Sequence, residues 1–365
     1  MFTAADYDYM AQAMQLAKKG LYTTDPNPRV GCVIVNNGDI VGSGYHIQAG
    51  GPHAEIHALR AAGDKAQGAT VYVTLEPCCH QGKTPPCTDA LIEAGVTRVI
   101  AAMQDPNPQV AGDGLLQLTQ HDIETEVGLL EQQAHELNPG FIHRMKLGRP
   151  YVRCKLAMSL DGRTAMASGE SKWITSEAAR MDVQRWRARS SAIMTGAGTV
   201  LADDPAMTVR LEGATRQPLR VIIDSNLSTP TNATILQQPG ETLILTCSDD
   251  EDAAQQLKQA GAQVVVMEKA NGRVDLPAVL NYLAAQQVNE VLLETGATLS
   301  GAMLQAGLID ELIFYVAPVL MGDNARGLFK LPGLEQMSDR IELTIKEIHK
   351  VGNDLRIQAI PNSRL

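Results

Sequence analysis

The sequence lacks any uninterrupted apolar run approaching the roughly 20 residues that a membrane-spanning helix requires. Its first residues, MFTAADYDYM, also lack the basic segment and the apolar run of a secretory signal peptide. Positive charge is not in excess either, since the formal net charge of the 365-residue chain is -10. Nucleic-acid binding depends on Lys and Arg neutralising phosphates. We therefore expect a cytoplasmic protein that binds neither a membrane nor a nucleic acid.

Cysteine is scarce and unevenly distributed. Only six cysteines are present, and three of them, Cys78, Cys79 and Cys87, fall within one short segment. A disulfide framework would be spaced more evenly, and a cytosolic chain keeps its thiols reduced. The cluster therefore favours a metal site. The other cysteines are expected to pack in the core: Cys32, Cys154 and Cys247.

The length suggests about two domains, and the pattern of helices and strands is interrupted at Lys146-Leu-Gly-Arg-Pro150, which we interpret as the linker. We expect an α/β chain with domains at 1–147 and 148–365. The first domain should be a three-layer α/β fold, because helices and strands alternate along it.

Hydrophobic periodicity and turn residues indicate the elements of both domains. In the first, Asp6 is expected to cap a helix, and Asn36-Asn-Gly-Asp39 should form a hairpin turn. Helices are expected there at 6–19, 53–62 and 88–94, and strands at 30–35, 70–75 and 97–102. In the second, strands are expected at 151–157, 192–195, 219–223, 242–245, 263–266, 290–293 and 311–316, with helices at 176–189, 251–260, 276–286 and 297–306.

Two segments of the first domain carry the residue types of a catalytic zinc site, PHAEIH at 52–57 and EPCCHQGKTPPC at 76–87. His53, Cys78 and Cys87 would supply three ligands and leave the fourth position for water, as catalytic zinc requires. Glu55 is too close to His53 in sequence for both to bind one metal easily, so it is free to move protons. Hydrolytic deamination needs such a group, because water must lose a proton and the leaving amine must gain one.

Two other interpretations of these residues remain open. A structural zinc site would need a fourth protein ligand, for which His57, Cys79 and His80 are the candidates. His53 and His57 also form an i,i+4 pair, as in a metalloprotease, but there the Glu directly follows the first His.

The H-x-E, P-C and second Cys pattern resembles the cytidine-deaminase-like zinc enzymes, although Cys78 and Cys87 are further apart than in their compact C-x-x-C. The intervening residues are expected to loop out and return. The long motif at 76–87, with PNPRVGCVIV at 26–35, resembles the deaminase domain of bifunctional riboflavin-biosynthesis deaminase/reductases. This resemblance covers essentially the whole chain. It implies that Asn27, between two prolines, contacts the substrate; a simple turn asparagine is the alternative.

The second domain contains no G-x-G-x-x-G motif after its first strand, and only the fragments TGAGT at 195–199 and TGATLSG at 295–301 could place a helix N-terminus against phosphate. Glycine-rich turns usually serve only the turn. However, KLAMSLDGR at 155–163, SKWIT at 171–175, GTVLADDP at 198–205 and ETGATL at 294–299 resemble the reductase half of the same family. That resemblance implies a dihydrofolate-reductase-like fold and NADPH as cofactor.

The resemblance also assigns residues of the second domain. Cofactor contacts are implied for Ala157, Trp173, Thr199, Asp203, Ser225, Gly296, Ala297, Thr298, Leu299, Ser300, Gly301 and Ala302. Substrate contacts are implied for Ser171, Arg187, Met207, Arg210 and Glu294. Arg187 and Arg210 suit phosphate, because guanidinium binds phosphate bidentately; without the resemblance, a solvated surface charge is the simpler interpretation. Lys155 and Asp203 are the candidates for polarising or positioning the sugar carbonyl.

The sequence thus predicts a homo-oligomeric enzyme of riboflavin synthesis that binds Zn²⁺ and NADPH and acts on a phosphorylated pyrimidine. The first domain would deaminate 2,5-diamino-6-(5-phosphoribosylamino)pyrimidin-4(3H)-one, and the second would reduce the ribosyl side chain to ribityl. Two alternatives stay open: a deaminase acting on tRNA or DNA with an accessory domain, and a non-catalytic zinc-stabilised binding protein. The first alternative predicts a basic surface and strong salt dependence, against which the acidic net charge argues.

Overall fold

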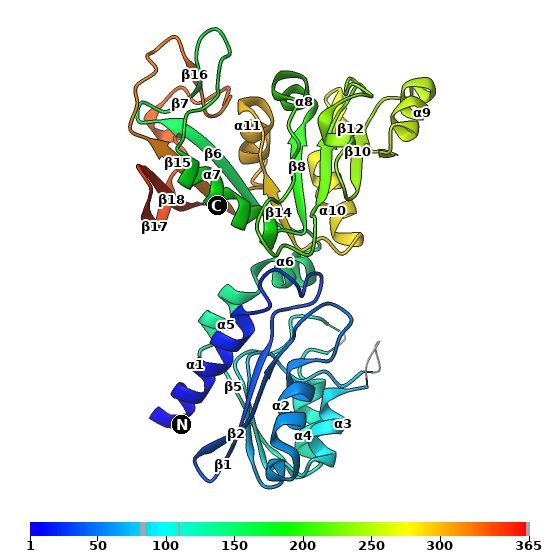
Figure 1. Cartoon of the computed structure of the whole chain (residues 1–365), viewed down its shortest axis with the longest axis vertical. Coiled ribbons are helices and arrows are strands. Elements are labelled where there is room, and N and C mark those ends of the chain that lie inside the picture. The colour runs from blue at the N-terminus through cyan, green and yellow to red at the C-terminus, as the bar shows by residue number, and fades with distance from the viewer. Residues whose placement is uncertain (81–84, 109, 363–365) are drawn as a thin grey trace. The chain divides into compact units, whose positions relative to one another are not determined.

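The computed structural model describes residues 1–80, 85–108 and 110–362. It divides into two compact units, Met1–Gly148 and Arg149–Leu365 (Figure 1). The boundary that we expected between residues 147 and 148 lies one residue before this division. Part of the segment expected to loop out between Cys78 and Cys87, residues 81–84, lies outside the described residues. Within the described ranges, no helix combines the length and apolar character needed to cross a bilayer.

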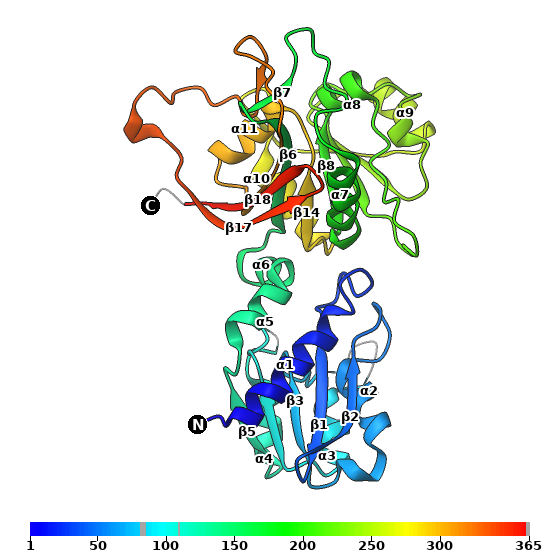
Figure 2. The same ribbon diagram turned by 60° about the vertical axis from the view of Figure 1, so that its left-hand side comes forward.

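The first unit has three layers, as predicted (Figure 2). Its sheet has the order β2-β1-β3-β4-β5, with α1 and α5 on one face and α2, α3 and α4 on the other. The strands are β1 (Gly31–Asn36), β2 (Asp39–Tyr45), β3 (Thr70–Val73), β4 (Arg98–Ala101) and β5 (Glu124–Val127). The helices are α1 (Ala4–Lys18), α2 (Ala54–Ala62), α3 (Cys87–Glu93), α4 (Asp113–Gln120), α5 (Glu131–Leu137) and α6 (Pro139–Leu147).

The predicted hairpin joins β1 and β2, and its turn residues Asn37 and Gly38 have φ of 53° and 88°. Positive φ at both positions is the type I′ requirement that Asn-Gly satisfies. Further along β2, Gly44 lies directly beneath α2: a Cβ there would come within 2.7 Å of the Ala54 carbonyl oxygen. Glycine therefore lets the start of α2 lie against the sheet, which fixes the backbone next to His53.

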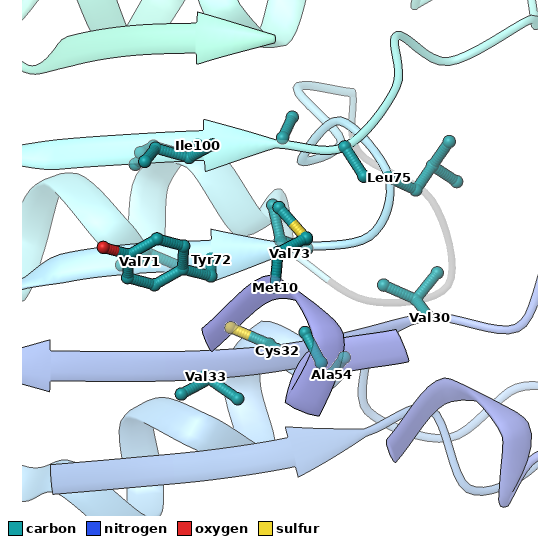
Figure 3. Close-up of a cluster of buried hydrophobic side chains, with 14 of the residues drawn as sticks. Met10, Val30, Cys32, Val33, Ala54, Val71, Tyr72, Val73, Leu75 and Ile100 are labelled. Carbon is teal, nitrogen blue, oxygen red and sulfur yellow. The ribbon is translucent and has the colours of Figure 1, made fainter. Parts of the chain in front are cut away.

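The core of this unit forms between the sheet and its helices. Figure 3 shows Cys32 of β1, Val73 of β3 and Ala54 of α2 among the buried side chains of this core, which also includes Met10 of α1. Met10 and Cys32 are fully buried, so the expected packing role of Cys32 is confirmed. Cys154 of the second unit is also fully buried, whereas Cys247 is only partly buried.

The start of α1 differs from the prediction. The helix begins at Ala4 with Thr3 as its N-cap, and Asp6 occupies the third helical position of a capping box. The Asp6 carboxylate accepts hydrogen bonds from the Thr3 backbone N–H at 2.7 Å and from the Tyr72 hydroxyl at 2.7 Å, and it pairs with Arg98 at 3.2 Å. Burial alone would raise the pKa of Asp6, but the hydrogen bonds from Tyr72 and Thr3, with the charge of Arg98, lower it to about 2.

The connection between the units is shorter than expected. Lys146 and Leu147 belong to α6, and the helix ends where Gly148 adopts a φ of 67°. A glycine in the left-handed conformation is a common helix end. Only residues 148–150 therefore separate the last helix of the first unit from the first strand of the second.

The second unit is built on a nine-stranded sheet of order β11-β10-β9-β8-β14-β6-β15-β18-β17, parallel from β11 to β15 and antiparallel beyond. Its strands are β6 (Tyr151–Ser159), β8 (Ala192–Gly196), β9 (Leu219–Ile223), β10 (Thr242–Thr246), β11 (Gln263–Val266), β14 (Glu290–Leu293), β15 (Glu311–Ala317), β17 (Leu343–Val351) and β18 (Asp354–Pro361). Two small ribbons are added by β7 (Arg163–Ala165) with β16 (Arg326–Gly327), and β12 (Lys269–Ala270) with β13 (Arg273–Val274). The helices are α7 (Glu177–Arg189), α8 (Ala197–Asp203), α9 (Glu251–Gln259), α10 (Leu276–Ala285) and α11 (Ala297–Gln305).

Replacing Asp6 tests the capping box. Asp6→Asn should destabilise the first domain by about 1–3 kcal/mol, because the amide nitrogen opposes N–H and O–H donors in a buried site. The folded-state pKa lies below the usual value, so this stabilisation is present at neutral pH and should be lost as pH falls from about 4 towards 2. Tryptophan fluorescence does not report the stability of the first domain, because both tryptophans lie in the second domain. Hydrogen exchange of the β3 amides therefore measures the stability change. The exposed Asp8→Asn is the control, and equal protection in the two variants would contradict the account.

Candidate active sites

The three expected zinc ligands come together in the first unit, although they come from separate segments. His53 immediately precedes α2, Cys78 lies in the loop after β3, and Cys87 is the first residue of α3. Their ligand atoms all lie within 4.8 Å of one another. Within the described ranges, His57, Cys79 and His80 do not join this group. The arrangement therefore favours three protein ligands over a closed structural site, and it gives no support to a His53–His57 protease pair.

The spacing of these atoms fits zinc. The Nδ1 atom of His53 lies 3.5 Å from the Cys78 sulfur and 3.3 Å from the Cys87 sulfur. Tetrahedral coordination with ordinary zinc–nitrogen and zinc–sulfur bonds separates such ligand atoms by about 3.6 Å. One imidazole and two thiolates at this separation are a donor set suited to zinc with one open position.

The two cysteines differ in their surroundings. A hydrogen bond from Cys87 lowers the pKa of Cys78 to about 4, and the backbone N–H of Cys87, at the start of α3, also donates to the Cys78 sulfur at 3.4 Å. The shared hydrogen bond raises the pKa of Cys87. A hydrogen bond with Cys78 likewise raises the pKa of His53. These contacts favour the thiolate form of Cys78, which is the form that binds zinc.

Glu55 lies beside the cluster and does not belong to it. It is the second residue of α2 and only 3% exposed, and among the residues that the structure describes, none hydrogen-bonds its buried Oε2 atom. Burial, followed by the charge of Cys78, raises the pKa of Glu55 to about 7. A carboxyl group with a pKa near neutrality, and with one oxygen uncommitted, is suited to both accept and return a proton.

Asn27 reaches the same site through a residue that the sequence did not single out, His46. The Asn27 side-chain nitrogen lies 3.1 Å from His46 Nε2, and His46 Nδ1 lies 3.0 Å from the Pro52 carbonyl oxygen. The Pro52 carbonyl oxygen can only accept a hydrogen bond, so Nδ1 of His46 carries the proton. In the neutral ring, Nε2 is then unprotonated and accepts a hydrogen bond from the Asn27 side-chain amide. Burial lowers the pKa of His46, which favours this neutral form, and its ring packs edge-on against His53. No motif marks His46, because its role arises from the tertiary fold.

In the second unit, the two glycine-containing turns lie side by side. They follow β8 and β14, which are adjacent parallel strands. The Thr199 hydroxyl accepts the Gly296 N–H at 3.2 Å and lies 3.3 Å from the Thr295 hydroxyl. Both α8 and α11 begin at this carboxyl edge of the sheet (Figure 1). Helix N-termini and their free N–H groups at such an edge fit the phosphates of a dinucleotide.

Next to this edge, Glu294 connects two of the expected basic residues. Its carboxylate accepts hydrogen bonds from Arg187 at 2.6 and 3.0 Å and lies 3.6 Å from the Lys155 amine. Burial alone would raise the pKa of Glu294, but the charges and hydrogen bonds of Arg187 and Lys155 lower it to about 2. A third Arg187 nitrogen donates to the Thr208 carbonyl at 2.9 Å. Arg187 is thus already paired with a carboxylate, whereas the Arg210 side chain is exposed.

The other expected contacts have varied surroundings. Trp173 is 71% exposed and stacks with Arg180, whereas the sulfur of buried Met207 lies 3.9 Å from Arg187. Ser225 accepts the Val274 N–H, and the Asp203 carbonyl accepts the Lys172 amine. Partly buried positions are Ala157, Ser171, Ala297, Leu299 and Ala302, while Thr298 is exposed.

Ser300 and Gly301, which lie within α11, face the interior of the second unit. Ser300 is fully buried, and its hydroxyl accepts a hydrogen bond from the Cys154 thiol. A Cβ on Gly301 would come within 2.2 Å of the Lys330 carbonyl oxygen. The side of α11 that carries these residues therefore packs against protein.

Comparison with known proteins gives matches along nearly the whole chain. A family model described as the RibD C-terminal domain matches residues 150–357, and one described as the cytidine and deoxycytidylate deaminase zinc-binding region matches residues 3–103. Riboflavin biosynthesis protein RibD of Escherichia coli is 54% identical over 97% of this chain and 99% of its own. The protein of the same name from Haemophilus influenzae is 48% identical over 99% and 98%.

Solved structures agree with these matches. Acinetobacter baumannii RibD, form 1, has a TM-score of 0.92 and 47% identity over 98% of this chain and 99% of its own. The Thermotoga maritima diaminohydroxyphosphoribosylaminopyrimidine deaminase/5-amino-6-(5-phosphoribosylamino)uracil reductase has a TM-score of 0.88 and 32% identity over the same shares.

Two cysteine variants test the ligand set. Cys87→Ser should lower zinc affinity by about 10-fold or more, because it removes one of three protein ligands. Cys79→Ser should retain zinc, since Cys79 stands outside the cluster. Metal analysis after dialysis against a weak chelator measures both. Loss of zinc from Cys79→Ser would show that the coordination differs from the one described.

Proposed function

Because the chain belongs to the RibD family of bifunctional riboflavin-biosynthesis deaminase/reductases, we propose the substrates and residue roles for its two reactions. Its first domain is the zinc-binding deaminase domain, and its second is the dihydrofolate-reductase-like reductase domain. The deaminase substrate is 2,5-diamino-6-(5-phosphoribosylamino)pyrimidin-4(3H)-one. Reduction of the deaminated product then gives 5-amino-6-(5-phosphoribitylamino)uracil. The Thermotoga maritima relative is named for the same two activities, a deaminase and a reductase.

The deaminase proposal depends on one observation: a buried, partly uncommitted carboxylate lies beside three zinc-type ligands. His53, Cys78 and Cys87 hold the zinc, which when bound makes water nucleophilic at neutral pH. Glu55 takes a proton from the attacking water and delivers it to the leaving amino nitrogen, so that ammonia departs as oxygen bonds to the ring carbon. Asn27, oriented by His46, binds the pyrimidine.

The reductase proposal rests on the two adjoining turns and the charged cluster beside them. NADPH is the proposed cofactor, and it supplies hydride when bound. The N-termini of α8 and α11 bind its phosphates, with Thr199, Ser225 and the exposed start of the 296–302 turn as contacts. Arg210, Arg187 and Glu294 position the phosphorylated substrate, while Lys155 and Asp203 orient and polarise the open-chain sugar carbon that accepts hydride. Cys78 and Cys87 must stay reduced to bind metal, which supports a cytoplasmic location.

A homo-oligomer is also proposed, formed through β17. This strand ends the nine-stranded sheet, and its pairing with β18 places Ile345, Ile348 and Leu355 on one face. These side chains are 58%, 55% and 41% exposed. A second copy of β17 can pair with this strand in an antiparallel arrangement whose centre lies between Lys346 and Glu347. Lys346 of one copy then lies opposite Glu347 of the other, and Ile345 of one copy lies opposite Ile348 of the other. Such complementarity, on the edge strand of the sheet, favours a second copy of this chain as the occupant.

Glu55→Gln tests the proton-transfer role. The variant should keep its zinc, because Glu55 is not a ligand, and should lose about 10²–10⁴-fold in deamination rate. Ammonia release from the diaminopyrimidine measures the loss. NADPH oxidation with the deaminated product serves as the internal control and should stay at the parental rate. Deamination at the parental rate would exclude Glu55, and absence of NADPH oxidation by the parent would exclude the reductase assignment.

Light scattering tests the oligomer. The parent should be dimeric, and Ile348→Glu should weaken the dimer by at least about 10-fold, because it places a charge in an apolar contact. Val266→Glu is the matched control, since Val266 is exposed on β11 at the opposite end of the sheet. A monomeric parent, or a dimer unaffected by Ile348→Glu, would contradict this interface.

A further inference from the structure

Glu76 is a buried acidic residue that the reaction scheme does not use. It follows β3 and precedes the zinc ligand Cys78 by two positions, and it is 3% exposed. Its carboxylate accepts hydrogen bonds from four backbone N–H groups at 3.0 to 3.3 Å, those of Asp105, Gly112, Gly114 and Leu115. All four belong to the segment between β4 and the first turn of α4. A single carboxylate therefore ties the metal-ligand loop to a second loop.

Two glycines permit this contact. A Cβ on Gly114 would lie 2.1 Å from the Pro77 carbonyl oxygen and 3.2 Å from Glu76 Oε1, so any side chain there would displace the Glu76–Pro77 backbone. Gly112 has a φ of 102°, which L side chains rarely adopt, and in this conformation its N–H points at Glu76. The second loop is thus shaped around the carboxylate.

Cys78 is fixed from its other side by α3. The Cys78 carbonyl accepts the Thr88 N–H at 3.2 Å and the Thr88 hydroxyl at 3.3 Å, and Thr88 directly follows the ligand Cys87. The Cys78 backbone is therefore held between the Glu76 carboxylate and the start of α3. Both contacts therefore act on the backbone that carries the Cys78 sulfur.

We propose that Glu76 is a positioning residue for the zinc site. Its hydrogen bonds to the 105–115 segment hold Pro77 and Cys78 in the place where the Cys78 sulfur meets His53 and Cys87. Glu76 itself does not belong to the His53–Cys78–Cys87 group. Groups that orient metal ligands in this way typically change metal affinity or activity by about 10–100-fold when replaced. The inference rests on the zinc role proposed above for the cluster.

Glu76→Gln in the full-length chain tests the proposal, because its amide nitrogen would oppose N–H donors that now meet a carboxylate oxygen. Zinc release to a chromogenic chelator should be at least about 10-fold faster than in the parent. The thiolate-to-metal absorption of the cobalt-substituted protein should change as well, since it reports the sulfur geometry. Gly114→Ala should behave in the same way, because it displaces the same backbone. Glu93→Gln, an exposed change on α3, should match the parent.

Hydrogen exchange of the β3 amides separates positioning from unfolding of the first domain, and NADPH oxidation in the second domain shows that the rest of the chain is intact. Both should persist in Glu76→Gln and Gly114→Ala. Zinc release at the parental rate in both variants, or loss of β3 protection in step with loss of zinc, overturns the role of Glu76. A parent that binds no zinc contradicts the proposed function itself, which is a different result.

Discussion

The deaminase half depends on placing one imidazole and two thiolates around a single point while keeping a carboxylate outside the coordination sphere. No segment of the first domain supplies all of these groups. His53 and Glu55 come from the start of α2, which lies against glycines of β2, whereas Cys78 and Cys87 come from the β3–α3 connection. His53 and Glu55, only two positions apart, therefore have different roles. His53 is the N-cap residue of α2 and belongs to the ligand cluster, whereas Glu55 is buried in the first turn of α2. This burial raises the pKa of Glu55.

The site proposed for the second domain lies at the carboxyl edge of a parallel sheet, the usual place for ligands in such folds. The turns after β8 and β14 meet there because these strands are neighbours, although they are far apart in sequence. The same adjacency brings Glu294 to Arg187 and Lys155. The two sites are therefore assembled differently: two separate segments of the first domain meet around one point, whereas adjacent parallel strands bring the residues of the second domain together.

The sequence was most informative where chemistry restricts residue type and spacing, or where a buried strand requires a continuous apolar run. The strands at 219–223 and 290–293 were predicted with their observed bounds, and the clustering of His53, Cys78 and Cys87 followed from two short segments. Local ambiguity caused the errors at Asp6 and at Lys146–Leu147, since Asp serves both as N-cap and in a capping box, and a helix continues until Gly148 ends it. The β17–β18 hairpin was missed because both faces of β17 are largely exposed and its alternation is weak. His46 and Glu76 could not be found, because their roles consist of tertiary hydrogen bonds.

The coordination sphere is the point on which the account of the first domain depends, and X-ray absorption at the zinc edge of the purified, full-length protein tests it most directly. The account predicts two sulfur ligands, one imidazole nitrogen and one light atom that does not come from a side chain, with one zinc per chain. A third sulfur, a second imidazole, or a chain that deaminates with no metal bound would contradict it.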